Sequence, residues 1–283
     1  MTKEEIKYPS YRSFLNERQY TNNSIMGLLV GSKLASHVLG VTRGSERTLP
    51  EIFPNVDKIE RFNLKPEFAQ KVLEDAEHHL GAMAVPHLLG LHEDYGKNCL
   101  QILQESGLIS SSEANGAKAW NIHIKFSAAT SENLDESCVG IYEILRKMRN
   151  CIIHAGGLAN ASLEEDLNSL SIETKTLWEN VTKEKIPSFR TGEKIQFSYP
   201  ETIAALAVLK RLSRQMNHIL GRVVGKEVWM KIMIEDFLNT SQIHQNRART
   251  VNSVHRFSSF NYAPLKFSKE EIEGFLFQEG IIK

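Results

Sequence analysis

The chain has little cysteine and no excess of charge of either sign. Its 283 residues include only three cysteines, Cys99, Cys138 and Cys151, which form no C-x-x-C pair. An odd number of scattered cysteines predicts reduced thiols, as in a cytoplasmic protein. Lys and Arg number 34, as do Asp and Glu, so the formal net charge is zero. This balance excludes a protein that is held to nucleic acid or membrane by its total charge alone.

The sequence also lacks a targeting segment and the familiar catalytic motifs. Residues 1–14 contain no apolar core of the kind that a signal peptide needs. The longest apolar stretch, residues 25–41, is too short and too polar to span a bilayer comfortably. No Walker loop, dinucleotide-binding glycine pattern, nucleophile elbow, zincin motif or zinc-knuckle spacing is present. We therefore expect a soluble, cytoplasmic protein without a cofactor.

One cluster of acids and histidines invites a metal-site interpretation. Asp75 and His79 are four residues apart, so both could reach one ion from a helix. No third ligand follows at helical spacing, and solvated helix residues explain the cluster better. We expect no metal site.

The residues that are present favour an all-α fold. The clearest helix follows Asn133, has apolar residues at intervals of three and four, and stops at Gly156-Gly157. Ser198 with Glu201 and Ser268 with Glu271 are capping pairs that predict further helix starts. Alternation over residues 120–126 suggests a short strand, and Thr191-Gly192 suggests a turn or hairpin.

The expected architecture is a helical bundle with a small hairpin or extended insertion. It divides into an N-terminal helical extension (1–65), a helical domain (66–238) and a basic C-terminal tail with a short terminal helix (239–283). Residues 239–267 show little periodicity.

Charge is unevenly distributed along the chain. Residues 202–269 hold 11 Lys and Arg against 3 Asp and Glu, and residues 237–269 hold no acid at all. The rest of the chain is correspondingly acidic. A basic C-terminal third on an otherwise acidic body predicts that any contact with RNA is confined to one face.

Three polar residues interrupt the last two turns of the clearest helix: Arg149, Asn150 and His154. They resemble the signature of the HEPN family, in which Arg is followed by Asn, Asp or His and then by His after a gap of four to six residues. The Ile-Ile-His-Ala-Gly-Gly sequence at 152–157 is similar to that of many members. Arg211/His218 and Arg249/His255 share only the spacing, because neither arginine is followed by Asn, Asp or His. A purely structural interpretation pairs Arg149 with a carboxylate and lets Asn150 and His154 finish the helix.

The residue types suit metal-independent cleavage of RNA. An imidazole side chain ordinarily titrates near neutral pH, so a histidine at position 154 can move a proton at the 2′-hydroxyl or the leaving oxygen. Arg149 can hold the phosphate and stabilise transition-state charge, and Asn150 can orient either group.

The resemblance implies an endoribonuclease that works as a homodimer, with its active site at the interface. It further implies a toxin or anti-phage defence effector that cuts tRNA or mRNA and is held by an antitoxin or sensor protein. The alternative is a non-catalytic HEPN module that binds a nucleotide, RNA or a protein partner.

Basic and aromatic residues alternate near the C-terminus, and four of them are candidates for RNA binding: Arg247, Arg249, Arg256 and Lys266. Cations beside aromatic rings suit single-stranded RNA. An equally good explanation is that this segment wraps a partner subunit or the acidic part of the chain.

Overall fold

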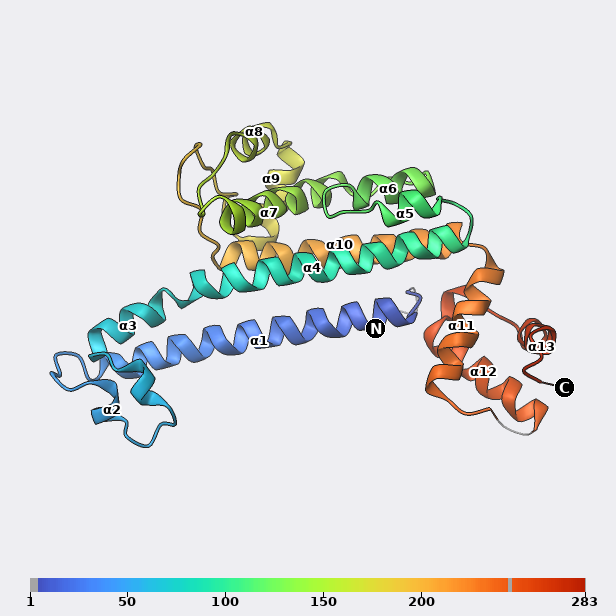
Figure 1. The fold of residues 1–283 in the computed structure, drawn as a ribbon, viewed down its shortest axis with the longest axis horizontal. Coiled ribbons are helices and arrows are strands. Elements are labelled where there is room, and N and C mark those ends of the chain that lie inside the picture. The colour runs from blue at the N-terminus through green and yellow to red at the C-terminus, as the bar shows by residue number, and fades with distance from the viewer. Residues whose placement is uncertain (1–4, 244–245, 283) are drawn as a thin grey trace. The chain divides into compact units, whose positions relative to one another are not determined.

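The computed structural model describes residues 5–243 and 246–282, and within these ranges the fold is all-α (Figure 1). The predicted fold class is therefore confirmed. Extended pairing among the described residues is limited to one isolated antiparallel bridge between Leu158 and Lys194.

The helices, in chain order, are α1 (Pro9–Gly40), α2 (Leu49–Ile52), η1 (Ile59–Phe62), α3 (Pro66–Glu74), α4 (Ala76–Glu105), α5 (Ser111–Asn115), α6 (Ile122–Thr130), α7 (Glu136–His154), α8 (Ala161–Ser169), α9 (Ile172–Thr182), α10 (Tyr199–Val223), α11 (Lys226–Thr240), α12 (Arg247–Asn261), η2 (Ala263–Leu265) and α13 (Lys269–Gln278). They form two units. The first comprises the described residues of 1–17, 89–143 and 207–283, and the second comprises residues 18–88 and 144–206.

The core of the first unit includes the N-terminal residues. The hydroxyl of Tyr8 lies 2.9 Å from that of Tyr95 on α4, and Tyr95 donates to the carbonyl of Ser213 on α10 at 3.2 Å. The amide of Asn217 accepts from the backbone N–H of Ile6 at 3.0 Å and donates to its carbonyl at 2.7 Å. These buried bonds fix the N-terminal segment to α10.

A buried carboxylate joins the start of α1 to α11. Both oxygens of Asp236 accept hydrogen bonds from the guanidinium of Arg12, at 2.7 and 2.8 Å. The hydroxyl of Tyr262 donates to Asp236 at 2.8 Å. The Asp236 side chain is only 2% exposed, so its charge is neutralised and hydrogen-bonded where water cannot reach it.

The second unit has its own apolar core. Leu39, Leu49 and Ala69 are buried together where α1, α2 and α3 meet. Gly81 on α4 lets the backbone approach closely, because a Cβ there would lie 2.9 Å from that of Phe197. The ring Nδ1 of His78 lies 3.0 Å from the carbonyl of Phe197 in the same place.

Two of the predicted helix starts are confirmed. Glu201 accepts a hydrogen bond from the backbone N–H of Ser198 at 2.8 Å at the start of α10. Ser268 and Glu271 form a reciprocal capping box before α13. At α7, however, the cap is not Asn133. Asp135 accepts from the N–H of Cys138 at 2.9 Å, and Asp135 is therefore the residue that satisfies the first turn.

The predicted strand at 120–126 is wrong, because α6 occupies this segment. Its buried residues Ile122, His123, Phe126 and Thr130 follow helical spacing. The alternation of Ile and polar residues in the sequence was fortuitous.

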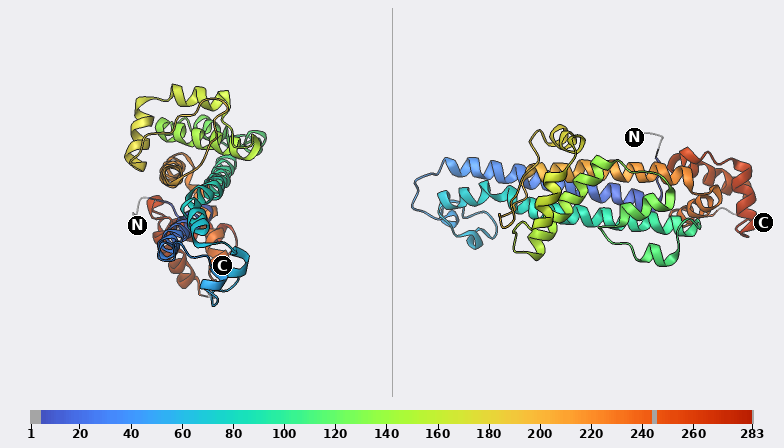
Figure 2. Two further views of the ribbon diagram at one scale, coloured as in Figure 1. Left: turned by 90° about the vertical axis from the view of Figure 1, so that its left-hand side faces the viewer. Right: turned by 90° about the horizontal axis from the view of Figure 1, so that it is seen from above.

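The segment 239–267 is also more regular than expected, since α12 spans Arg247–Asn261 and contacts α11 and α13 (Figure 2). Its buried face consists largely of small or polar residues: Thr250, Val251, Val254, Ser258 and Asn261. Because few of these buried residues are apolar, the sequence of α12 shows little of the apolar periodicity by which a helix is recognised. The apolar stretch at 25–41 is part of a longer helix, since α1 begins at Pro9, and α4 continues through Pro86.

Candidate functional site

The three residues of the HEPN-like motif lie at the end of α7, in the second unit. The helix stops because Gly156 and Gly157 both adopt positive φ, of 62° and 80°. The N–H groups of Ala155 and Gly157 both donate to the carbonyl of Cys151 at 3.0 Å. The chain thus folds back over the last turn and leaves His154 as the final helical residue.

None of the three motif residues has an intramolecular partner among the residues that the structure describes. The side chains of Asn150 and His154 form no hydrogen bond, and the Arg149 guanidinium forms no ion pair, with the described residues. The Nε of Arg149 is buried without a hydrogen-bond partner, although the side chain as a whole is only partly buried. The carboxylate partner and the capping contact that a structural role requires are thus not found in the described chain.

A neighbouring cation behaves differently. The ammonium group of Lys147, one turn before Asn150, donates to the hydroxyl of Ser162 at 2.7 Å and pairs with Asp166 on α8. Lys147 therefore fastens α8 to α7. Lys147 thus has a partner within the fold, whereas the side chains of the motif residues at the end of the same helix have none among the described residues.

A second segment reaches the end of α7. Residues 190–193 form a tight turn, with a hydrogen bond of 3.0 Å from Glu193 N–H to Arg190 carbonyl and with Gly192 at φ +88°. The expected turn is present, but the segment pairs with residues 157–159 rather than with itself. Ala159 N–H donates to Glu193 at 2.8 Å, and Ile195 N–H donates to Gly157 at 2.7 Å.

This pairing adds a cation that the sequence analysis missed. Lys194 is exposed, forms no ion pair among the described residues, and is bridged to Leu158, four residues beyond His154. Partners in an antiparallel bridge project to the same side. Nothing in the local sequence reveals that Lys194 meets Leu158, because the pairing joins segments 36 residues apart.

The regularity of α7 separates Arg149 from His154. Five residues of a helix turn through about 500°, so the two side chains point about 140° apart and are offset by about 7.5 Å along the axis. Helical bonding continues through Ala155, so the end of the helix does not remove this divergence. One copy of α7 by itself does not aim both side chains at one phosphate.

The predicted RNA-binding residues lie in the first unit, on or near α12. Arg247 is occupied: its guanidinium lies 2.6 Å from Glu273 and 5.7 Å from the centre of the Phe277 ring. Arg249 and Arg256 are exposed and have no ion pair within the described ranges, and Lys266 is exposed with a φ of 49°. The residues of the α7 motif and these cations thus belong to different units.

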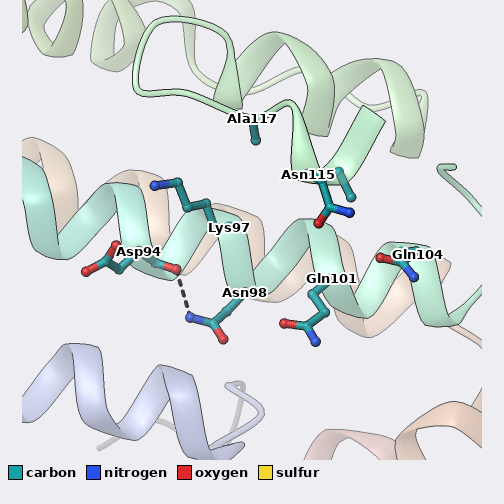
Figure 3. Close-up of a pocket in the computed structure, with 8 residues that line it drawn as sticks. Asp94, Lys97, Asn98, Gln101, Gln104, Asn115 and Ala117 are labelled. Carbon is teal, nitrogen blue, oxygen red and sulfur yellow. Dashed lines mark hydrogen bonds between the residues drawn. The ribbon is translucent and has the colours of Figure 1, made fainter. Parts of the chain in front are cut away.

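Arg256 borders a groove of about 410 Å³ that is also lined by Phe237, Ser241, Gln242, Ser253 and Phe257. A cation, an aromatic ring and hydroxyl groups together suit a nucleotide. A groove of about 600 Å³ along α4 has a different character (Figure 3). Its Lys97 is paired with Glu93 at 2.8 Å and its Asn98 donates to the carbonyl of Asp94 at 2.8 Å. Its side chains are mostly neutral amides, and they offer little charge to a phosphate.

Two other histidines are buried in the first unit. The Nε2 atoms of His92 and His123 lie 2.9 Å apart, and Nδ1 of His92 has no partner. Burial lowers the pKa of His123 to about 4. Burial first, and the neighbouring His123 second, hold the pKa of His92 well below its ordinary value. These neutral imidazoles are part of the core.

No cluster of three or more His, Cys, Asp or Glu suitable for a metal ion occurs in the part of the chain that the structure describes. In the same part, no helix combines the length and apolar character needed to cross a membrane. No protein-family model, curated protein or solved structure matches the chain.

Proposed function

We propose that the protein is a metal-independent endoribonuclease of the HEPN type, with its reacting groups at the end of α7. The observation that carries the proposal is the set of three unpartnered polar residues there, with the Nε of Arg149 both buried and without a hydrogen bond. An unsatisfied buried donor costs free energy, commonly about 1–3 kcal/mol. A bound phosphate would supply the missing acceptor.

The chemistry follows from the residue types. The exposed His154 takes the proton of the ribose 2′-hydroxyl, or gives one to the leaving 5′-oxygen. Arg149 holds the phosphate and offsets the charge that develops on it, while Asn150 orients the phosphate or the imidazole. The products are a 2′,3′-cyclic phosphate and a 5′-hydroxyl.

The divergence of Arg149 and His154 favours a site composed of two copies. A two-fold axis beside the end of α7 would bring Arg149 of one protomer toward His154 of the other. In this arrangement the divergence within one helix is required rather than unfavourable. A protein that is strictly monomeric while cleaving RNA would contradict the composite site.

The exposed Arg249 and Arg256 on α12 support RNA binding by the same protein. The groove beside Arg256 adds the partly buried ring of Phe257, a surface on which a base can stack. We propose that these residues bind the substrate strand and take no part in the reaction. Lys266 and Arg247 contribute less, since Arg247 is already paired with Glu273.

The decisive experiment compares RNA cleavage by the wild type and single variants. Incubation with total RNA should give cyclic-phosphate ends, and His154→Ala should lower the rate by about 10²- to 10⁴-fold. Arg149→Ala should cost about 10²- to 10³-fold. His218→Ala is a matched control, because His218 is also exposed and follows an arginine at family-like spacing without the adjacent Asn. Equal loss in the control would refute the assignment.

One observation favours the alternative, a non-catalytic module that binds RNA, a nucleotide or a protein. In a monomer, the regular end of α7 keeps Arg149 and His154 apart, so the divergence that a dimer would use leaves a single chain without a complete reaction site. If wild type and His154→Ala leave RNA equally intact but both bind labelled single-stranded RNA, the binding function is the correct one.

We extend the proposal to a toxin or anti-phage effector that cuts tRNA or mRNA and is restrained by an antitoxin or sensor. Expression of the wild type should then arrest growth and fragment cellular RNA, whereas His154→Ala should do neither. Normal growth with intact RNA on expression of the wild type would argue against the toxin role.

A further inference from the structure

The segment after the 190–193 turn presents two polar side chains to solvent. Ile195 and Phe197 are 3% and 1% exposed, whereas Lys194 and Gln196, which alternate with them, are exposed. Successive side chains of an extended chain point to opposite faces. Lys194 and Gln196 therefore share the outward face of this segment, which belongs to the second unit.

The backbone that carries Lys194 is held from two directions. On the α7 side, the N–H of Ile195 donates to the carbonyl of Gly157 at 2.7 Å. On the α4 side, the carbonyl of Phe197 lies 3.0 Å from Nδ1 of His78. A binding group on a backbone that is already fixed needs little reorganisation to meet its ligand.

The bridge determines how far Lys194 lies from His154. Hydrogen bonds flank the pair of Leu158 and Lys194 and do not join the two residues to each other, an arrangement in which facing Cα atoms are about 4.5 Å apart. The N–H of Leu158 donates to the carbonyl of Ala155 at 3.1 Å, and such a turn keeps these two Cα atoms within about 7 Å. With the one further residue to His154, the Cα atoms of His154 and Lys194 are at most about 15 Å apart.

The ammonium group of Lys194 is available to a ligand. Neither an ion pair nor a side-chain hydrogen bond of Lys194 occurs among the described residues. The two acids that contact the turn bond to its backbone instead. Glu193 accepts from the N–H of Arg190 at 2.9 Å. Glu164 accepts from the N–H of Thr191 at 2.8 Å.

The chain between His154 and Leu158 leaves room for a ligand. Gly156 lies between them, has a φ of 62° and is exposed. A Cβ on Gly156 would meet no atom within 4 Å apart from its chain neighbours. Glycine at such a point allows a bound molecule to approach the backbone closely.

We propose that Lys194 binds a phosphate that flanks the cleaved one and thereby positions the RNA strand across the end of α7. The inference rests on the ribonuclease activity proposed above, in which Arg149 holds the phosphate that reacts. The ammonium group of lysine is a compact charge on a flexible stem, which suits a single phosphate. Gln196, on the same face, can bond through its amide to the ribose or base of the same nucleotide.

A flanking phosphate takes no part in the reaction, so its contact with Lys194 is equally strong in the substrate and in the transition state. Loss of such a contact raises KM and leaves kcat unchanged. The contact also matters only for RNA that is long enough to supply a second phosphate. These two properties distinguish a lysine that positions the substrate from one that supports the fold.

The test compares a dinucleotide, which contains only the cleaved phosphate, with a hexanucleotide, which also contains flanking ones. Lys194→Ala should raise KM for the hexanucleotide about tenfold at low salt and leave kcat unchanged. It should change neither constant for the dinucleotide, and Lys194→Arg should restore most of the hexanucleotide KM. Lys71→Ala is the matched control, since Lys71 is also exposed and lies on α3 of the same unit.

A lower kcat in Lys194→Ala, an equal rise in KM for both substrates, or an unchanged KM for the hexanucleotide would overturn the proposal. Binding of the corresponding 2′-deoxy oligonucleotides, which cannot be cleaved, separates this claim from the activity. If the wild type cleaves no RNA, the ribonuclease proposal fails. Equal binding of the deoxy-hexanucleotide by the wild type and Lys194→Ala then shows that the phosphate site fails as well, whereas weaker binding by the variant alone supports the phosphate site.

Discussion

Two arginines, one in each unit, show how a cation that is paired within the chain differs from one that is not. Arg12 donates two hydrogen bonds to the buried Asp236, and the hydroxyl of Tyr262 donates a third to the same carboxylate. Part of the Arg149 guanidinium is also buried, yet its Nε has no hydrogen-bond partner. The first arrangement is satisfied within the chain, whereas the second leaves a buried donor without an acceptor among the described residues.

The histidines repeat this contrast. His92 and His123 are buried and hydrogen-bonded to each other, whereas the exposed His154 forms no side-chain hydrogen bond or ion pair with the described residues. Residue type alone therefore does not tell which of these groups are satisfied within the chain. Burial and partners do, and substitutions at paired and unpaired groups should differ greatly in their effects.

Removal of the buried carboxylate should cause the greatest loss of stability. Asp236→Ala leaves Arg12 without its partner, which should lower the free energy of unfolding by about 3–5 kcal/mol. Arg149→Ala removes a buried donor that has no acceptor, so it should leave the free energy of unfolding unchanged or raise it, by up to about 1–3 kcal/mol. Urea denaturation of both variants measures the difference. Equal losses would mean that Arg149 has a structural partner after all.

Acid should destabilise the first unit through its histidine pair. The folded protein favours neutral His123, with a pKa of about 4, while the unfolded chain binds protons below about pH 6.5. The stabilisation is therefore complete above pH 6.5 and is lost as the pH falls toward 4. The loss for this one group is about 2 kcal/mol by pH 5.

Thermal melts at pH 7, 6 and 5 measure this dependence. His123→Phe should flatten it, and the control His154→Gln should leave it intact, because His154 is exposed. A melting temperature that does not change between pH 7 and 5 in the wild type would contradict the role of the buried pair.

Lys194 should matter for RNA and not for folding. Its bridge to Leu158 is made by backbone atoms, so Lys194→Ala removes only the exposed ammonium group. We expect the salt slope of RNA binding, or of KM for cleavage, to fall by about 1. Lys147→Ala is the matched control, since Lys147 is already paired with Asp166 and its loss should leave the slope unchanged.

The smallest effects are expected on α12. Arg249→Ala and Arg256→Ala should each reduce the salt slope of single-stranded RNA binding by about 1, without loss of stability. Arg247→Ala should instead cost up to about 1 kcal/mol of stability and leave binding nearly unaltered, because Arg247 is paired with Glu273. Equal effects of all three on binding would remove the distinction between paired and exposed arginines.

The helices that could be predicted are those whose signals are local. Ser198 with Glu201 and Ser268 with Glu271 mark helix starts within four residues, and Gly156-Gly157 marks the end of α7 because few other residues adopt positive φ. The α12 helix was missed because polar residues such as Thr250 and Asn261 occupy its buried face. The strand predicted at α6 was wrong because the apolar residues of this segment fit both the alternation of a strand and the spacing of a helix.

The sequence by itself determined the all-α class, the course of α7 and the positions of Arg149, Asn150 and His154 on it, because helical periodicity and glycine punctuation act over a few residues. Only the tertiary structure decided which cations are occupied, since Lys147 with Asp166, Arg12 with Asp236 and Arg247 with Glu273 join distant segments. It also brought Lys194 to Leu158. A polar residue's partners are set by the packing of remote helices, and that packing determines which groups remain free to act on another molecule.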